Sequence, residues 1–478
     1  MEALMLNRLT AHDVCVDARR ILFHIPTSGL FDLDEVGSAV LDLFKERESV
    51  SADHIQRCFD GRFDPSEVVE TIQEFMDLDI ITDGRPARQN RIPLKITEYP
   101  LSTIVLNVNT GCNLGCTYCY KEDLAIPAKG EKMDFETATK SVELLLREGH
   151  SRDRMNIVFF GGEPLSNMPL IRQVVDYAER RGSELGKTID FSLTTNATLL
   201  TEEIVDYLND HRFGISISMD GPKPLHDKHR ITVGGKGTYD IVAKKTRMLL
   251  SRYDSRPVGA RVTLTAGNTD VMGIHQHLKY DLGFFEVGFA PVTTSDMAHF
   301  NLSGEELQAV FDNMKTLGER YVQAALRNEN IGFSNMHQLM NDLYEGSRKT
   351  LPCGAGIGML AVDKKGELNL CHRFTGSTLP TYGNVDDGID KANLAQFLES
   401  AADRDGTVCE TCRIRNLCAG GCYHESYAHF SDPLSPNYHY CNIMRDWIDF
   451  SIDVYTRIMA ENPRFFASHI TPRRAVQQ

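Results

Sequence analysis

The twelve cysteines of this 478-residue chain are concentrated in two groups, and this distribution constrains the fold more than any other feature. Three of them, Cys112, Cys116 and Cys119, lie in the short stretch GCNLGCTYCY. Seven more follow residue 350, whereas Cys15 and Cys58 stand apart. Packing of a hydrophobic core does not require cysteines so close together in the sequence. In a large chain without an evident secretory signal, clustered cysteines indicate metal sites rather than disulfides.

The first group has the spacing CX3CX2C and offers three thiolates on one short loop. Structural zinc sites take four protein ligands, commonly as two pairs. An iron–sulfur cube can instead be held by three cysteines, which leaves one iron without a protein ligand. The spacing therefore favours an iron–sulfur cluster, with zinc as the competing interpretation.

Charge and hydropathy exclude several classes of partner. The chain has 51 Lys and Arg against 66 Asp and Glu, a formal net charge of −15, which disfavours binding to nucleic acid or to anionic membranes. No run of about 18 apolar residues predicts a membrane span. The first residues, MEALMLNRLTAHDVCVD, lack a basic segment followed by an apolar one. We therefore expect a cytoplasmic protein.

Residues 1–92 are predicted to form a small separate unit of winged-helix-like order. Short strands are expected at 14–17, 21–25 and 29–33, followed by helices at 34–46, 51–59 and 65–79, with Ser51 as an N-cap and Pro65 in a first turn. Residues 1–90 contain 18 acidic and 9 basic side chains, which argues against DNA binding. A peptide-docking unit, in which an exposed strand edge pairs with an extended peptide, fits this charge better.

After a polar linker at 83–93, strands and helices alternate. Strands are predicted at 103–109, 156–160, 188–193, 214–219, 258–265 and 286–292, with helices between them. Six such units in about 200 residues predict an α/β fold with a parallel sheet, open or barrel-like, whose site lies at the carboxyl ends of the strands. The CX3CX2C loop, GGEP (161–164), TTNAT (194–198) and MDGP (219–222) each follow a predicted strand.

This order of motifs resembles the radical S-adenosylmethionine (radical SAM) superfamily, in which the position before the third cysteine is usually aromatic, here Tyr118. The resemblance implies a partial (β/α)6 TIM-type barrel over residues 93–330. It also implies a 4Fe–4S cluster on Cys112, Cys116 and Cys119, whose vacant iron binds S-adenosylmethionine. The cofactor contacts that it implies are Tyr118, Gly161, Gly162, Glu163, Pro164, Thr195, Asn196, Ser218, Asp220 and Arg230, with Arg261 as a weaker candidate.

Each of these contacts has a plainer interpretation. GGEP alone is a common turn sequence, and the polar residues after the strands can serve as ordinary strand-end caps. For Arg261 the plain alternative is solvation at the surface. His226 and His229, in the same segment as Arg230, are interpreted as structural residues.

The second group of cysteines matches the SPASM extension of peptide-modifying radical SAM enzymes. By this resemblance, a bridging segment at 331–352 precedes a Cys-rich SPASM domain at 353–445, and a C-terminal helix and tail occupy 446–478. The resemblance implies two auxiliary 4Fe–4S clusters, and hence three clusters in all. One is held by Cys409, Cys412, Cys418 and Cys441, and the other by Cys353, Cys371 and Cys422.

Two positions depart from the anaerobic sulfatase-maturing branch. Met359 stands where that branch has an eighth cysteine, so the second auxiliary cluster has either an open iron or a ligand other than cysteine. His372 stands where that branch has an aspartate base. Asp403 and Asp405 are alternative carboxylates near the substrate, although solvated loop charges are the simpler interpretation of both.

Within the superfamily, the chain most resembles the maturases of quinohemoprotein amine dehydrogenase. That resemblance implies thioether bonds between Cys and Asp or Glu in the small subunit of the dehydrogenase, which would dock on the N-terminal unit. It also implies a flavodoxin- or ferredoxin-type reductant. The alternatives are a formylglycine-forming sulfatase maturase, an enzyme acting on another ribosomal peptide, and a non-catalytic iron–sulfur adaptor. An adaptor would have no need of a cluster with a vacant iron.

Overall fold

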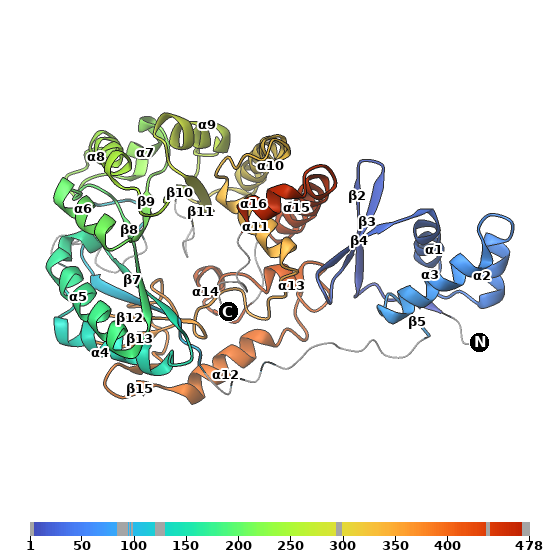
Figure 1. Cartoon of the computed structure of the whole chain (residues 1–478), viewed down its shortest axis with the longest axis horizontal. Coiled ribbons are helices and arrows are strands. Elements are labelled where there is room, and N and C mark those ends of the chain that lie inside the picture. Colours follow the sequence, from blue (N-terminus) through green and yellow to red (C-terminus); the bar gives the residue numbers. More distant parts are fainter. Residues whose placement is uncertain are drawn as a thin grey trace.

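The computed structural model describes residues 4–83, 94, 96, 99–119, 130–292, 299–435 and 440–470 (Figure 1). The predicted linker falls almost entirely outside these residues, as does the end of the predicted C-terminal tail. Within the described part, an α/β body with a curved parallel sheet is joined to a small N-terminal sheet unit and a Cys-rich C-terminal region.

The body contains all six predicted parallel strands, in sequential order across the sheet. β6 is buried along almost its whole length, whereas buried residues alternate with partly exposed ones along β7, β8 and β9, because successive side chains of a strand point to opposite faces. The strands end close to their predicted positions: β6 (Thr103–Asn109), β7 (Arg154–Gly161), β8 (Thr188–Thr195), β9 (Gly214–Ser218), β10 (Val258–Leu264) and β11 (Glu286–Pro291).

Helices follow the strands along the outer face of the curved sheet (Figure 1). Asp134 and Thr201 cap two of them, accepting hydrogen bonds from the backbone N–H groups of Thr137 and Ile204, because the first turn of a helix has no internal acceptors. The helical elements are α4 (Phe135–Glu148), the 3₁₀ turn η2 (Pro164–Asn167), α5 (Met168–Leu185), α6 (Glu202–Asp210), α7 (Lys223–His229), α8 (Tyr239–Arg252), α9 (Val271–Gln276) and the π-helical turn η3 (His277–Asp281).

The sheet is larger than the sequence predicts, because the Cys-rich region adds two strands to it. β12 (Met359–Val362) pairs in parallel with β6, and β13 (Leu368–Asn369) pairs antiparallel with β12. The eight-stranded order is β11-β10-β9-β8-β7-β6-β12-β13. The Cys-rich region is thereby attached to β6, the strand that leads into the CX3CX2C loop.

The N-terminal unit contains the predicted strands followed by the predicted helices. β2 (Ala11–Val16), β3 (Arg19–His24) and β4 (Gly29–Leu33) form an antiparallel sheet, and β1 (Met5–Leu6) pairs with β5 (Ile81–Thr82). The helices are α1 (Glu35–Glu46), α2 (Ala52–Phe59) and α3 (Pro65–Asp77). Ser51 caps α2, and Pro65 begins α3, as the sequence predicts.

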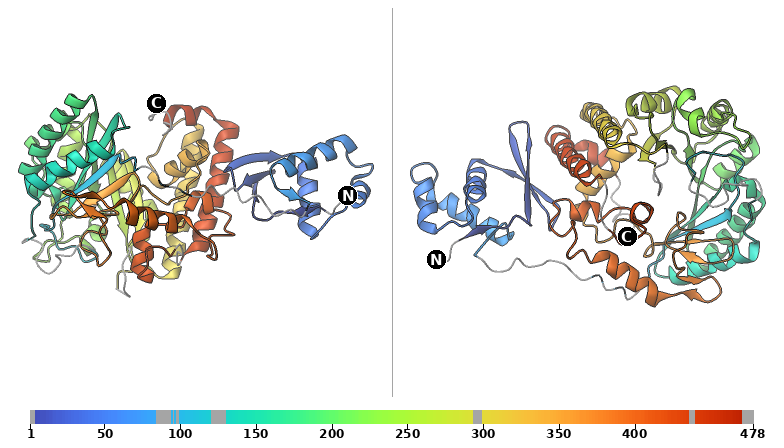
Figure 2. Two further views of the ribbon diagram at one scale, coloured as in Figure 1. Left: turned by 90° about the horizontal axis from the view of Figure 1, so that it is seen from below. Right: turned by 180° about the vertical axis from the view of Figure 1, so that it is seen from behind.

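The remaining helices join the Cys-rich region to the body and the body to the N-terminal unit (Figure 2). The longest of them, α10 (Gly304–Leu326), begins with a capping box between Ser303 and Glu306. The others are α11 (Ser334–Tyr344), α12 (Lys391–Ala402), α13 (Arg415–Cys418), α14 (Tyr423–Phe430), α15 (Cys441–Glu461) and α16 (Arg464–His469), with the short strands β14 (Gly383–Asn384) and β15 (Gly388–Ile389).

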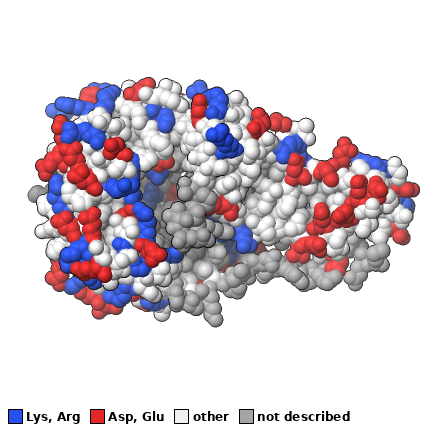
Figure 3. Space-filling model, viewed as in Figure 1, with Lys and Arg blue, Asp and Glu red and all other residues white. Residues whose placement is uncertain are grey.

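The surface agrees with the acidic composition, since Asp and Glu side chains spread over the visible face of the N-terminal unit (Figure 3). No helix in the described part of the chain is both long enough and apolar enough to span a bilayer.

Candidate functional site

The CX3CX2C loop leaves the carboxyl end of β6 and is held in place by backbone hydrogen bonds to a neighbouring segment. The N–H groups of Gly115 and Thr117 donate to the carbonyls of Ile231 (2.9 Å) and His229 (3.1 Å). Within the loop, Cys119 N–H donates to the Cys116 carbonyl (3.1 Å). The segment after α7 therefore positions all three predicted ligands.

The three thiols lie in a partly buried, mutually interacting group. Burial, with a smaller contribution from the charge of Cys119, raises the pKa of Cys112 to about 12 and that of Cys116 to about 11. Thiols in this environment stay protonated unless a cation stabilises the thiolates. The Arg230 guanidinium lowers the pKa of Cys116, and the Leu114 N–H donates to Cys112 Sγ (3.4 Å). This donor set fits a group that supplies positive charge to several thiolates.

The arrangement of the thiols bears on the zinc alternative. Across the part of the chain that the structure describes, no three Cys, His, Asp or Glu side chains form a group suited to one metal ion. A zinc site requires all its ligands within about 2.3 Å of one ion, whereas the thiolates of an iron–sulfur cube are bound to different irons. The preference for the cluster therefore rests on the CX3CX2C spacing, which supplies three thiolates from one loop.

GGEP lies against the start of the cysteine loop, and its two glycines are required there for steric reasons. A Cβ atom on Gly162 would lie 2.1 Å from the Gly111 carbonyl oxygen, and one on Gly161 would lie 2.2 Å from the Asn109 oxygen. Gly161 also has a φ of +143°. The sequence suggests that the glycines admit a ligand. In the structure they admit the backbone that carries Cys112. Pro164, buried, begins the η2 turn that follows.

Glu163 is buried, with 1% of its surface exposed, and both carboxylate oxygens accept hydrogen bonds from the protein. Oε1 accepts from Thr195 Oγ1 (2.6 Å) and from Leu165 N–H (3.1 Å), and Oε2 accepts from Asn196 N–H (2.8 Å). Burial raises the pKa of Glu163 to about 7 despite these bonds. The structure thus gives the carboxylate a connecting role between the ends of β7 and β8. Its predicted contact with the cofactor ammonium stays a prediction.

Asn196 connects the end of β8 to the cysteine loop. Its side-chain amide donates to Cys112 Sγ (3.7 Å) and to Asn113 Oδ1 (3.0 Å), and Asn113 Nδ2 donates to Thr198 Oγ1 (2.8 Å). The sequence analysis missed Asn113 and Thr198. The sequence offers one indication of their role: Asn113 lies in the CX3CX2C loop and Thr198 in TTNAT, and both motifs follow strands whose carboxyl ends lie at the same edge of the sheet.

Asp220 is the centre of a buried polar network beside the cysteines. Oδ2 accepts from Tyr118 Oη (2.5 Å) and pairs with Arg230 Nε (3.0 Å), and Oδ1 accepts from Thr263 N–H (3.0 Å). Burial alone lowers the pKa of Arg230, but Asp220, Tyr118 and Cys116 raise it above its usual range. Burial raises the pKa of Tyr118 as well. Arg230, predicted to meet the methionine carboxylate, is therefore a fixed cation next to the cluster loop.

The remaining predicted cofactor contacts lie on the adjacent strands. Ser218 ends β9 and stands directly opposite Arg261 in the pairing of β9 with β10. Arg261 is exposed, and its Nη1 lies close to Gly288 of β11, where a Cβ would be 2.5 Å away. His226 and His229 are buried and contact Thr238 Oγ1 (3.0 Å) and Thr117 Oγ1 (2.6 Å), which is consistent with structural roles.

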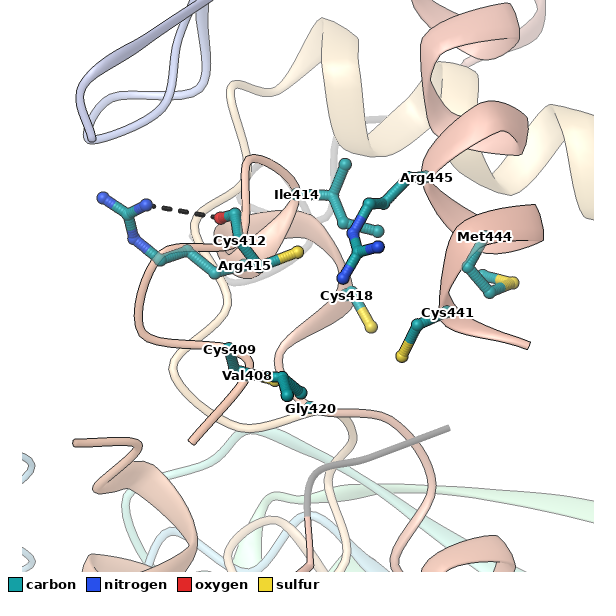
Figure 4. A pocket seen from close by; sticks show the side chains of 10 residues that line it. All are labelled: Val408, Cys409, Cys412, Ile414, Arg415, Cys418, Gly420, Cys441, Met444 and Arg445. Carbon is teal, nitrogen blue, oxygen red and sulfur yellow. Dashed lines mark hydrogen bonds between the residues drawn. The ribbon is translucent and has the colours of Figure 1, made fainter. Parts of the chain in front are cut away.

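Four C-terminal cysteines line one pocket, as expected for one auxiliary cluster (Figure 4). Burial raises the pKa of Cys418 to about 11. Arg445, four residues after Cys441 on α15, reaches into the pocket, and its bond to the Cys412 thiol raises the pKa of Arg445. The sequence analysis missed Arg445, although a spacing of four on a helix signals a shared face. The four cysteines are Cys409, Cys412, Cys418 and Cys441.

The other predicted set, Cys353, Cys371 and Cys422, also lies together. Burial, with smaller contributions from the charges of Cys422 and Cys353, raises the pKa of Cys371 to about 11. Met359 begins β12, and its N–H donates to the Gly354 carbonyl (2.8 Å). The buried Tyr423 hydroxyl, near Cys353 and Cys422, has no hydrogen-bond partner within the described residues. Three thiols with an unpartnered hydroxyl nearby fit a cluster with one position not filled by cysteine.

The three candidate catalytic residues lie in different surroundings. The His372 ring is 4.1 Å from that of Phe160, centre to centre, so it reaches the residue that precedes GGEP. Asp403 and Asp405 are exposed after α12, and Asp405 N–H donates to Asp403 Oδ1 (3.1 Å). Their positions are those of solvated loop charges, whereas the His372 ring packs against Phe160, next to GGEP, and its catalytic role stays a prediction.

Comparison with known proteins agrees with this geometry. The model of the radical SAM superfamily matches residues 106–272, which include the CX3CX2C loop and GGEP. The chain is a radical SAM enzyme. It is related to the SPASM-type branch of that class, as the following similarities show.

The radical SAM cyclopropyl synthase TigE of Paramaledivibacter caminithermalis is 25% identical over 426 residues, which cover 84% of this chain and 85% of that protein. A cysteine-type anaerobic sulfatase-maturating enzyme of Clostridium perfringens is 24% identical over 369 residues, 74% of this chain and 96% of its own length. The crystal structure of Streptococcus suis SuiB bound to the precursor peptide SuiA has the same fold, with a TM-score of 0.50 at 15% identity. It covers 91% of this chain and 98% of that one.

Proposed function

We propose that this radical SAM enzyme is a peptide maturase. It removes hydrogen from an Asp or Glu side chain and joins that carbon to a cysteine sulfur within the same polypeptide, the small subunit of a quinohemoprotein amine dehydrogenase. The observation that carries the proposal is the incomplete set of Cys353, Cys371 and Cys422, with Met359 in place of a further cysteine. It leaves a position at which a substrate thiolate can bind an auxiliary cluster.

The protein supplies ligands, orientation and a dry site for this chemistry. S-adenosylmethionine on a reduced 4Fe–4S cluster supplies a carbon radical strong enough to take hydrogen from an unactivated carbon. Cys112, Cys116 and Cys119 would hold that cluster, which fits the donor set described above. The salt bridge between Asp220 and Arg230 fixes a cation beside Cys116. GGEP and the end of β8 form the adjacent wall.

The N-terminal unit would present the substrate polypeptide. β2 and β4 are the two edges of its sheet, and β2 packs against α15 of the body. β4 carries Phe31 with 40% of its surface exposed. An extended peptide can add to such an edge through backbone hydrogen bonds, with an apolar side chain covering Phe31. In SuiB, a structure of the same fold, a precursor peptide is bound.

Each thioether bond removes one hydrogen from carbon and one from sulfur, so two electrons leave the substrate. The carbon-centred radical formed by hydrogen removal accounts for one electron. An auxiliary cluster would accept the other and pass it on to a flavodoxin- or ferredoxin-type protein. We assign the removal of the sulfur proton to His372, whose ring contacts that of Phe160 near the end of β7.

Mass spectrometry of a co-expressed candidate subunit tests this function. We expect the subunit to lose two hydrogens for each bond. The cross-linked cysteines should no longer react with alkylating reagents. Phe31→Asp should reduce the yield of modified subunit, whereas Val69→Asp, at an exposed site on α3, should not. An unmodified subunit in the presence of active enzyme would reject the substrate assignment.

The second candidate is formylglycine formation, favoured by similarity to a sulfatase-maturating enzyme. It would oxidise a single serine or cysteine and leave no cross-link. His372 in place of the aspartate base of that branch argues against it. Incubation with a sulfatase peptide separates the two, because only formylglycine formation yields an aldehyde that reacts with hydrazine reagents.

A further inference from the structure

The central strand of the N-terminal sheet, β3, contributes side chains to two separate hydrophobic cores. Ile21, Phe23 and Ile25 of the β3 segment belong to the hydrophobic core of the body, together with Trp447 of α15. Leu22, between them, belongs to a separate core formed with α1 to α3. Because side chains alternate along a strand, β3 contributes one face to each core. The N-terminal unit is therefore packed against the body, as Figures 1 and 2 show.

Two polar contacts across this junction come from one short segment, residues 413–417. Arg415 Nη2 donates to the Leu9 carbonyl (2.7 Å), and Asn416 Nδ2 donates to the Ile25 carbonyl (2.6 Å). These acceptors lie just before β2 and just after β3. Because Ala11 pairs with His24, both acceptors lie at the same end of the β2–β3 hairpin, which two neighbouring residues of the Cys-rich region thus hold.

Arg413 makes a third connection, through α15. Its Nη2 pairs with Asp449 Oδ2 (2.7 Å), and Asp449 Oδ1 pairs with His12 Nε2 of β2 (3.1 Å). The Asp449 carboxylate is thereby shared between the N-terminal sheet and the Cys-rich segment.

Segment 413–417 is the chain between two cysteines of one cluster set, Cys412 and Cys418. Ile414 and Leu417 are each 3% exposed and anchor the segment in the core. Arg415 Nη1 also donates to the Cys412 carbonyl (3.3 Å; Figure 4), and the Asn416 carbonyl accepts from Lys349 N–H (2.8 Å). Five residues between two ligands have little freedom once both ligands are bound.

We propose that assembly of the auxiliary cluster on Cys409, Cys412, Cys418 and Cys441 seats the N-terminal unit on the body, with Arg415 and Asn416 as the positioning residues. Metal binding at both ends fixes segment 413–417, and this segment holds the ends of β2 and β3. Without the cluster, the segment and the junction open locally. The biological purpose would be that only an enzyme with its cluster in place presents a peptide, and this purpose rests on the proposed function. The physical coupling between the cluster and the junction is independent of that function.

Hydrogen–deuterium exchange of the reconstituted full-length protein tests the positioning residues. Arg415→Ala/Asn416→Ala removes both contacts but keeps all cysteines. We expect exchange in residues 9–25 to become faster by on the order of tenfold, as two lost hydrogen bonds imply. Exchange in α1 and the iron content should stay as in the wild type. Arg348→Ala, at an exposed arginine nearby, is the matched control and should change neither.

A second comparison tests the role of the cluster. Cys412→Ala/Cys418→Ala should lose about a third of the iron of a protein with three such clusters and should show the same faster exchange in residues 9–25. Cys353→Ala/Cys371→Ala should lose a similar share of iron without that change. Equal protection of residues 9–25 in all variants would overturn the proposal, and so would faster exchange in both cysteine variants alike. Neither result depends on turnover, so failure here is distinguishable from failure of the proposed function.

Discussion

At the scale of single residues, the site depends on charged groups buried next to predicted metal ligands. Asp220 and Arg230 have side chains that are 2% and 10% exposed, so each charge depends on the other for compensation. The sequence identified both residues, because strand-end motifs locate them. It did not predict that they pair with each other, because pairing depends on how α7 folds back over the cysteine loop.

Asp220→Asn should lower the free energy of unfolding by about 3 to 5 kcal/mol, because it leaves the Arg230 charge buried without a counter-charge. Urea unfolding monitored by circular dichroism under anaerobic conditions measures this effect. Arg230→Gln should cost a similar amount, and the double variant should cost much less than the sum of the two. Strict additivity would show that the pair does not act as a unit.

Glu163 should make stability depend on pH. Its pKa is about 7 in the folded protein and about 4.3 when exposed. Between these values the folded state binds more protons than the unfolded state, so stability falls as pH rises from about 4.5 to 7. The loss from this group is about 3 kcal/mol. Glu163→Gln should flatten the unfolding profile over this window, and an equally steep profile would show that another group is responsible.

At the scale of elements, hydrophobic periodicity predicted the six strands and their parallel sheet, since strands that alternate with helices require crossover connections. It did not predict β12 and β13, which contain four and two residues. Strands that short carry no periodic signal, and their place beside β6 is set by tertiary pairing. The sequence identified the two glycines of GGEP as site residues. It did not predict that they make room for the backbone of Asn109 and Gly111, at the start of the cysteine loop.

Gly162→Ala should displace the cysteine loop, because the new Cβ would lie 2.1 Å from backbone. We expect the loss of about a third of the bound iron, from the first cluster only, and destabilisation by about 3 kcal/mol, as for other severe steric conflicts. Iron assay and electron paramagnetic resonance measure the loss. Gly304→Ala, at a helix start with open space around it, is the control and should retain all the iron.

At the scale of the whole molecule, the N-terminal unit is part of the enzyme body through one face of its sheet. The sequence predicted the unit and its acidic charge, but it could not tell which face of β3 would be shared with the body. Both faces are apolar, and the choice depends on α15, more than 400 residues further along the chain.

Adjacent substitutions on β3 should therefore have different effects. Phe23→Ala should loosen the junction and raise the radius of gyration measured by small-angle X-ray scattering, because it empties a site in the body core. Leu22→Ala should instead speed amide exchange in α1 and α3, because Leu22 belongs to the core of the N-terminal unit. Identical responses to the two substitutions would contradict the two-core arrangement.

The central claim is that Cys112, Cys116 and Cys119 hold a cluster on which S-adenosylmethionine is cleaved. The most direct measurement is the formation of 5′-deoxyadenosine by the anaerobic, reconstituted and chemically reduced protein with S-adenosylmethionine. We predict product from the wild type and none from the variant with all three cysteines replaced by alanine, which should keep the iron of both auxiliary sets. Absence of 5′-deoxyadenosine from the wild type, with or without a peptide, would contradict the claim.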